Sequence, residues 1–165
     1  MIDKIEYNVI EVCSDPWAQQ VSRYWSFVGK LKPCYVLLGT CDLAEILLIG
    51  KESSHEGQVY GLLFNNPAKF PKIRNFIWHE VGHIKSQKTD DPVECEFSAD
   101  KWAVEESVKR GYWRIVDEII FRCLDFLSLE EDSVYFKSSK RIISHFYGIV
   151  EERDIIGRYK KKLKI

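Results

Sequence analysis

Residues 73–84 read Ile-Arg-Asn-Phe-Ile-Trp-His-Glu-Val-Gly-His-Ile, and this stretch combines a helical pattern with a candidate metal site. Its apolar residues recur at the spacing of one helix face, namely Ile73, Phe76, Ile77, Val81 and Ile84. Within it, residues 79–83 match the pattern H-E-x-x-H. We therefore predict a helix over residues 71–86 that buries this apolar face and turns its histidines toward a cleft.

The two histidines of the motif are four residues apart. In a helix they point only about 40° apart, so both imidazoles can reach one ion at Zn–N distances of about 2.0–2.1 Å. Glu80 projects beside them, where its carboxylate can accept a proton from a metal-bound water whose pKa zinc lowers to about 7. We predict that His79 and His83 bind one Zn²⁺ ion and that Glu80 is the general base.

A zinc site with two histidines needs a third protein ligand. A second helix is predicted over residues 94–110, and one of its faces carries small and acidic residues, namely Glu96, Ala99, Asp100, Ala103 and Ser107. Such a face suits close approach to the first helix at Gly82. We predict that Glu96 is the third ligand and that Asp100 accepts the other ring N–H of a ligating histidine. The alternative is a solvated acidic helix start, since carboxylates are favoured at helix N-termini.

The two motifs together resemble those of the gluzincin metallopeptidases, whose second motif is Glu-x-x-Ala-Asp-x-aromatic-Ala. Residues 96–103 read Glu-Phe-Ser-Ala-Asp-Lys-Trp-Ala. They are similar to the soluble ImmA/IrrE family, and also to the HtpX-type membrane endopeptidases, which share Glu-Phe-x-Ala-Asp. The resemblance covers residues 59–107. It implies a compact zincin-like fold, zinc bound by His79, His83 and Glu96, and a catalytic Glu80.

The rest of the chain predicts a small sheet followed by helices. Strands are expected from alternating or apolar runs at residues 5–12, 35–38, 46–49 and 59–64. A helix is expected from Pro16 to Gly29, with its cap in Ser14-Asp15. Two further helices are expected at 114–128 and 132–148. This order indicates an α+β fold.

We predict that residues 1–165 form one zincin-like domain, consisting of the N-terminal sheet, the H-E-x-x-H helix, the glutamate helix and C-terminal helices. Residues 152–165 are predicted to be a basic, frayed tail. The strand at 59–64 is expected at the edge of the sheet, where zincins pair with an extended peptide.

Composition restricts the classes of partner. The chain has 165 residues, 24 basic and 25 acidic side chains and 45% hydrophobic residues, so a basic surface for nucleic acid is expected only at the tail. Five cysteines without a Cys-x-x-Cys pair fit neither a disulfide framework nor a zinc ribbon, which indicates reduced thiols in a cytoplasmic protein. No apolar run reaches the roughly 20 residues that cross a bilayer, so no membrane association is expected.

The predicted function is zinc-dependent hydrolysis of peptide bonds in an intracellular protein, with Glu80 moving the proton. Candidate donors for the oxyanion are Tyr112, His145 and Tyr147, although a packed helix residue is the simpler interpretation of His145. His55 is interpreted as a surface-loop residue. One alternative is a zincin-like module that binds a regulatory or nucleic-acid partner without cutting it. Another is a metal-dependent hydrolase for a different bond, since fold does not fix substrate.

Overall fold

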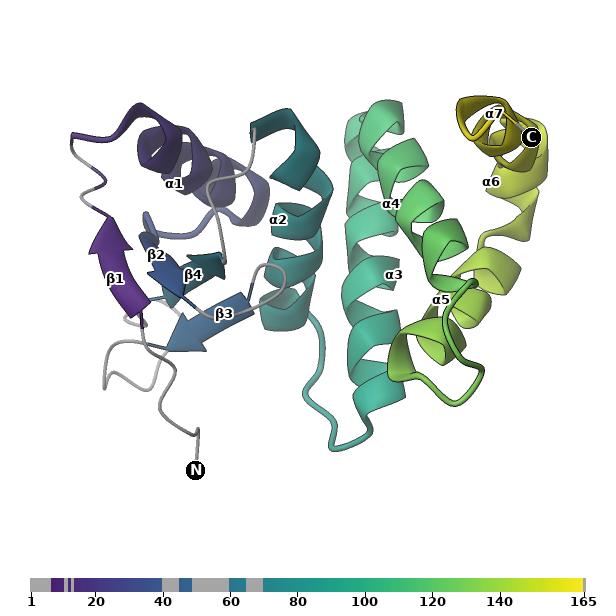
Figure 1. Cartoon of the computed structure of the whole chain (residues 1–165), viewed down its shortest axis with the longest axis horizontal. Coiled ribbons are helices and arrows are strands. Elements are labelled where there is room, and N and C mark those ends of the chain that lie inside the picture. The colour runs from purple at the N-terminus through teal and green to yellow at the C-terminus, as the bar shows by residue number, and fades with distance from the viewer. Residues whose placement is uncertain are drawn as a thin grey trace. The chain divides into compact units, whose positions relative to one another are not determined.

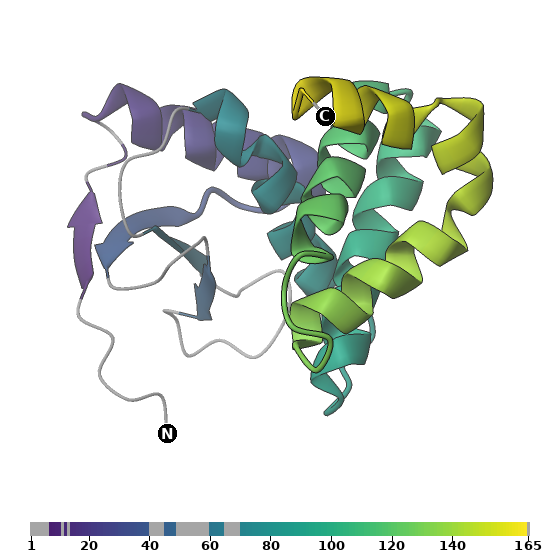
Figure 2. The same cartoon turned by 45° about the vertical axis from the view of Figure 1, so that its right-hand side comes forward.

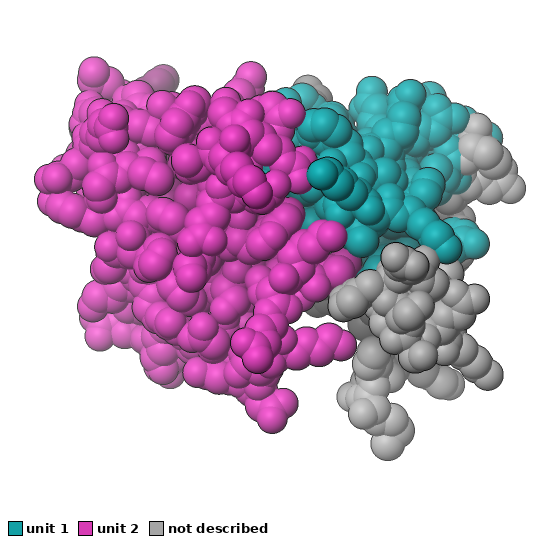
Figure 3. Space-filling model, turned by 180° about the vertical axis from the view of Figure 1, so that it is seen from behind, with its two compact units in different colours: residues 1–81 teal, residues 82–165 magenta. Residues whose placement is uncertain are grey.

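The computed structural model describes residues 7–10, 12, 14–39, 45–48, 60–64 and 70–164. Contacts group the chain into two compact units, residues 1–81 and 82–165, which are teal and magenta in Figure 3. The boundary falls inside helix α2 (Phe70–Lys85). Helix α2 is continuous across this boundary, so the two units share one helix. The single domain over residues 1–165 stays a prediction. The described strands all precede α2, with one helix between the first two strands, so the α+β class is confirmed.

Among the described residues, the first unit contains a four-stranded sheet in the order β1-β2-β4-β3 (Figure 1). Its strands are β1 (Tyr7–Ile10), β2 (Tyr35–Gly39), β3 (Glu45–Leu48) and β4 (Tyr60–Phe64). The central pair, β2 and β4, is parallel, and both outer pairs are antiparallel.

The prediction that the strand at 59–64 lies at a sheet edge is wrong, because β4 lies between β2 and β3. Residues 61–64 of β4 are all buried. A strand that is apolar on both faces suits a central position, whereas an edge strand leaves part of its surface to water. The edge on this side of the sheet is β3.

Helix α1 (Pro16–Gly29) begins where the sequence predicts, because the Asp15 side chain accepts a hydrogen bond from the Ala18 N–H at 2.8 Å. It contacts β2 and buries Val21, Trp25 and Val28. On α2, the indole N–H of the fully buried Trp78 donates to the Tyr24 hydroxyl at 2.8 Å. This bond ties α1 to the residue that directly precedes the first motif histidine.

The second unit is helical (Figure 2), with α3 (Pro92–Arg110), α4 (Trp113–Phe126), α5 (Val134–His145), α6 (Tyr147–Glu152) and α7 (Ile155–Lys162). Helices α3, α4 and α5 contact one another, and α7 contacts α4. Asp91 caps α3, and Gly111 ends it in the left-handed conformation, at φ 76°. The helix predicted over 132–148 is interrupted at Phe146, between α5 and α6.

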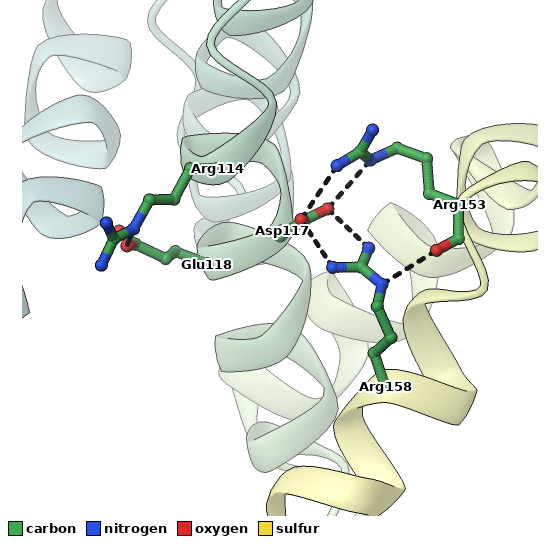
Figure 4. Close-up of polar contacts among 5 residues, drawn as sticks. All are labelled: Arg114, Asp117, Glu118, Arg153 and Arg158. Atoms are coloured by element: carbon green, nitrogen blue, oxygen red, sulfur yellow. Dashed lines mark hydrogen bonds and ion pairs between the residues drawn. The ribbon is translucent and has the colours of Figure 1, made fainter.

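The prediction of a frayed tail over residues 152–165 is wrong, because α7 covers most of it. Ile155 is fully buried. Arg153 and Arg158 each donate two hydrogen bonds to the buried Asp117 carboxylate of α4, at 2.8–3.0 Å (Figure 4). Two arginines on one carboxylate hold the end of the chain against α4.

Asp117→Asn is expected to lower the free energy of unfolding by about 2 kcal/mol at pH 7, since two arginines lose a buried anionic partner. Burial raises the pKa of Asp117, but hydrogen bonds from Arg158 and Arg153 outweigh it and hold this pKa below its usual value. A depressed folded-state pKa stabilises the protein above the unfolded-state pKa, and this is lost as pH falls through the folded value. In urea unfolding at decreasing pH, the difference between wild type and variant should therefore shrink in acid. A difference independent of pH would contradict this account.

The described cysteines, Cys34, Cys95 and Cys123, are free thiols. Burial raises the pKa of Cys34 to about 12, and it also raises that of Cys123. Both therefore stay protonated at neutral pH. Among the described residues, no helix is long and apolar enough to cross a membrane.

Candidate metal centre

Helix α2 presents the motif as the sequence predicts, with bounds within one residue of the expected 71–86. Ile73, Ile77, Trp78 and Val81 are buried. Phe76 and Ile84, also expected on the apolar face, are half-buried. Glu80 is only 7% exposed, which is rare for a glutamate outside a paired or functional setting. The carboxylate is thus shielded from bulk water.

The side chains of His79, Glu80 and His83 converge along this one helix. One potential ligand atom from each lies within 4.8 Å of the other two. Among the described residues, this is the one group of three or more His, Cys, Asp or Glu side chains close enough to share a metal ion. The i, i+4 spacing of the histidines produces this arrangement. Imidazole nitrogens with a nearby carboxylate are a donor set that suits zinc and other first-row transition metals.

Glu96 lies beside His83 within the second unit. The distance from His83 Nε2 to Glu96 Oε1 is 3.4 Å, and both side chains are partly buried, at 27% and 20% exposure. Two atoms that each lie about 2.0–2.1 Å from a tetrahedral ion are about 3.3 Å apart, so this spacing fits two ligands of one zinc. Glu94 behaves differently, because it faces outward and pairs with Arg141 at 2.7 Å. The alternative interpretation, a solvated carboxylate at the start of the helix, therefore fits Glu94 better than Glu96.

The close approach of α3 at Gly82, which the sequence predicts, is confirmed. A Cβ atom at Gly82 would lie 2.8 Å from the carbonyl carbon and 2.9 Å from the Cα of Ala99, and closer still to its carbonyl oxygen. Ala99 and Ala103 are fully buried. The Ser86 hydroxyl donates to the Ser98 carbonyl at 3.0 Å, just beyond this contact. Glycine at 82 thus lets α3 approach closely enough for Glu96 to reach His83.

Cys95 is directed to the connector between the two helices. Its thiol donates to the Thr89 carbonyl at 3.1 Å. Neighbouring helix positions point about 100° apart, so Cys95 and Glu96 cannot easily share one ion. This agrees with the choice of Glu96 as the ligand.

Asp100 is buried, and its carboxylate has partners from α4. It accepts a charge-assisted hydrogen bond from Arg122, and the Cys123 thiol lies 3.8 Å from its second oxygen. Sequence reasoning missed Arg122, although an arginine inside the apolar run of α4 is a detectable signal, because such a residue needs a buried anion. The hydrogen bond that Asp100 would accept from the ring N–H of a ligating histidine stays a prediction.

The other candidate residues have ordinary surroundings. The His145 ring packs edge-on against Phe97, with the ring centroids 5.7 Å apart. The Tyr147 hydroxyl donates to Glu151 at 2.7 Å, which raises its pKa. Tyr112 precedes α4 and is 38% exposed. His55 lies outside the described residues.

No family model, curated protein or solved structure matches this chain. Membership of the gluzincins therefore stays a prediction that rests on the two motifs. The convergence of His79, Glu80 and His83 and the separate spacing of Glu96 from His83 are independent of that resemblance.

Proposed function

We propose that the chain is a zinc-dependent metallopeptidase that hydrolyses peptide bonds of an intracellular protein. The observation that carries the proposal is the 3.4 Å spacing of His83 and Glu96, added to the convergence of His79, Glu80 and His83 on one helix. In this proposal His79, His83 and Glu96 hold the ion. Three protein ligands leave one position of a tetrahedral site for solvent, which is the arrangement of catalytic rather than structural zinc.

When bound, a zinc ion supplies a Lewis acid for the scissile carbonyl and a water whose pKa falls to about 7. Glu80 takes the proton of the attacking water and then gives it to the leaving amine. Burial of Glu80 supports this role, since packing restricts its rotamers and excludes competing solvent. Arg122 donates to Asp100, and in this proposal Asp100 accepts the free ring N–H of a ligating histidine and so fixes its orientation.

The substrate backbone has a candidate docking edge in the first unit. Strand β3 is the outer strand next to β4, and an extended peptide can add to such an edge through main-chain hydrogen bonds. This position replaces the one expected for residues 59–64. The proposal of a reducing, cytoplasmic location is supported by the free thiols of Cys34, Cys95 and Cys123.

A non-proteolytic binding module is the second candidate. The observation that favours it is the exposed basic last turn of α7, which carries Lys160, Lys161 and Lys162. This basic turn alone gives no reason for a buried Glu80 beside two histidines, so the peptidase is preferred.

The test is cleavage of a proteome-derived peptide library by the purified chain, with new termini read by mass spectrometry. Zinc-loaded protein should generate new termini, chelation should stop this, and one equivalent of zinc should restore it. An intact library in the presence of stoichiometric bound zinc would overturn peptidase activity and favour the binding module. The Glu80→Gln variant, loaded with zinc in the same way, is the matched control and should generate few new termini.

A further inference from the structure

An open groove of about 880 Å³ lies within the second unit, between the first half of α3 and helix α5. Its apolar lining consists of Val93 and Phe97 from α3 and Phe136 from α5. The predicted chemistry of the metal ligands uses none of these residues. The groove is a separate feature, and its role can be tested without zinc.

The aromatic base of the groove is held in place by its neighbours. Phe97 is 9% exposed. The guanidinium of Arg141 lies 3.9 Å from the centroid of its ring, and His145 packs against its edge. Arg141 also donates to Glu94 at 2.7 Å, so the charge of this arginine is already compensated. The buried Phe97 ring therefore forms the floor of the groove, and the half-buried Val93 and Phe136 supply the apolar surface that an incoming side chain would contact.

The rim of the groove carries positive charge that is not compensated. Lys137 and Lys140 lie one turn apart on α5, and both are exposed. Neither forms an ion pair within the described part of the chain. The groove lining contains one acidic side chain, Glu131. Since Glu94 compensates Arg141, the rim keeps two lysines, Lys137 and Lys140, against one carboxylate, Glu131.

We propose that this groove binds an acidic peptide segment of a partner protein, with an apolar anchor residue on Val93 and Phe136. Carboxylates on either side of the anchor would pair with Lys137 and Lys140. A peptide fits better than a nucleic acid, because Glu131 in the lining would repel a continuous phosphate backbone. The separate charges of a peptide can pair with the lysines and avoid this glutamate.

The test is fluorescence anisotropy with a labelled Asp-Glu-Phe-Asp-Leu-Glu peptide. The protein is the full chain carrying Glu80→Gln, so that the probe stays intact. The neutral isostere Asn-Gln-Phe-Asn-Leu-Gln should bind about tenfold more weakly. The double variant Lys137→Glu/Lys140→Glu should weaken binding of the acidic probe by about tenfold or more, since attraction becomes repulsion at two sites.

The matched control is Lys32→Glu/Lys72→Glu, which changes net charge equally at exposed positions of the first unit. Its affinity should stay within about twofold of the parent. If both double variants lost the same affinity for the acidic probe, the loss would reflect net charge alone, and the proposal would be overturned. Equal binding of the neutral peptide would also overturn it. Tighter binding of a short single-stranded oligodeoxythymidine, lost in the Lys137/Lys140 variant, would assign the groove to nucleic acid instead.

Discussion

Glu80→Gln is expected to retain one zinc ion per chain and to lose about 10³-fold in the rate of peptide hydrolysis. Glutamine has nearly the same shape as glutamate, so it fits the buried position without disturbing α2. It cannot accept the proton of the attacking water, and it is not one of the proposed ligands. The measurement is the initial rate with a quenched fluorescent peptide chosen from the library, together with zinc content by mass spectrometry.

The matched control for this prediction is Glu105→Gln on α3, where an exposed glutamate pairs with Lys101 at 3.8 Å. This variant should hydrolyse the peptide at the wild-type rate, because an exposed ion pair contributes little. Undiminished hydrolysis by Glu80→Gln would show that another group moves the proton and would remove the catalytic role of Glu80.

Gly82→Ala should have the largest effect on stability, with a loss of about 3 kcal/mol in the free energy of unfolding. The added methyl group would meet the backbone of Ala99, which cannot rotate away as a side chain can. Relief requires α3 to move, and Glu96 moves with it, so zinc affinity should fall as well. Urea unfolding and a zinc competition titration measure the two effects.

Gly148→Ala is the control for this second prediction, because a methyl group there meets no atom within 4 Å. Its stability should be unchanged or should rise by up to about 1 kcal/mol, as alanine reduces the entropy of the unfolded chain. A Gly82→Ala protein as stable as wild type would show that α3 does not depend on this close approach.

Local patterns in the sequence were sufficient to predict the helices around the metal centre. Helices α2 and α3 begin and end within two residues of their predicted bounds, because apolar periodicity, a capping Asp91 and a terminal Gly111 act over short distances. The pairing of Glu96 with His83 was predictable for the same reason. A small residue at 82 and small residues at 99 and 103 indicate two helices in close contact.

Features that depend on distant residues were not predicted. The position of β4 inside the sheet follows from strand pairing, which an apolar run does not specify. Helix α7 was predicted to be a frayed tail because its basic composition is typical of a solvated end. Its order depends on Asp117, 36 residues before Arg153, and on the burial of Ile155. The pair of Asp100 and Arg122 is long-range in the same sense.

The central claim is that one chain holds a catalytic zinc ion through His79, His83 and Glu96. The most direct test is zinc K-edge X-ray absorption on the purified chain loaded with one equivalent of zinc. The account predicts four-coordinate zinc with nitrogen and oxygen ligands at about 2.0–2.1 Å, including two imidazoles. Loss of the carboxylate oxygen in Glu96→Ala should accompany weaker binding. A zinc–sulfur distance of about 2.3 Å, or a chain that retains no zinc, would contradict the claim.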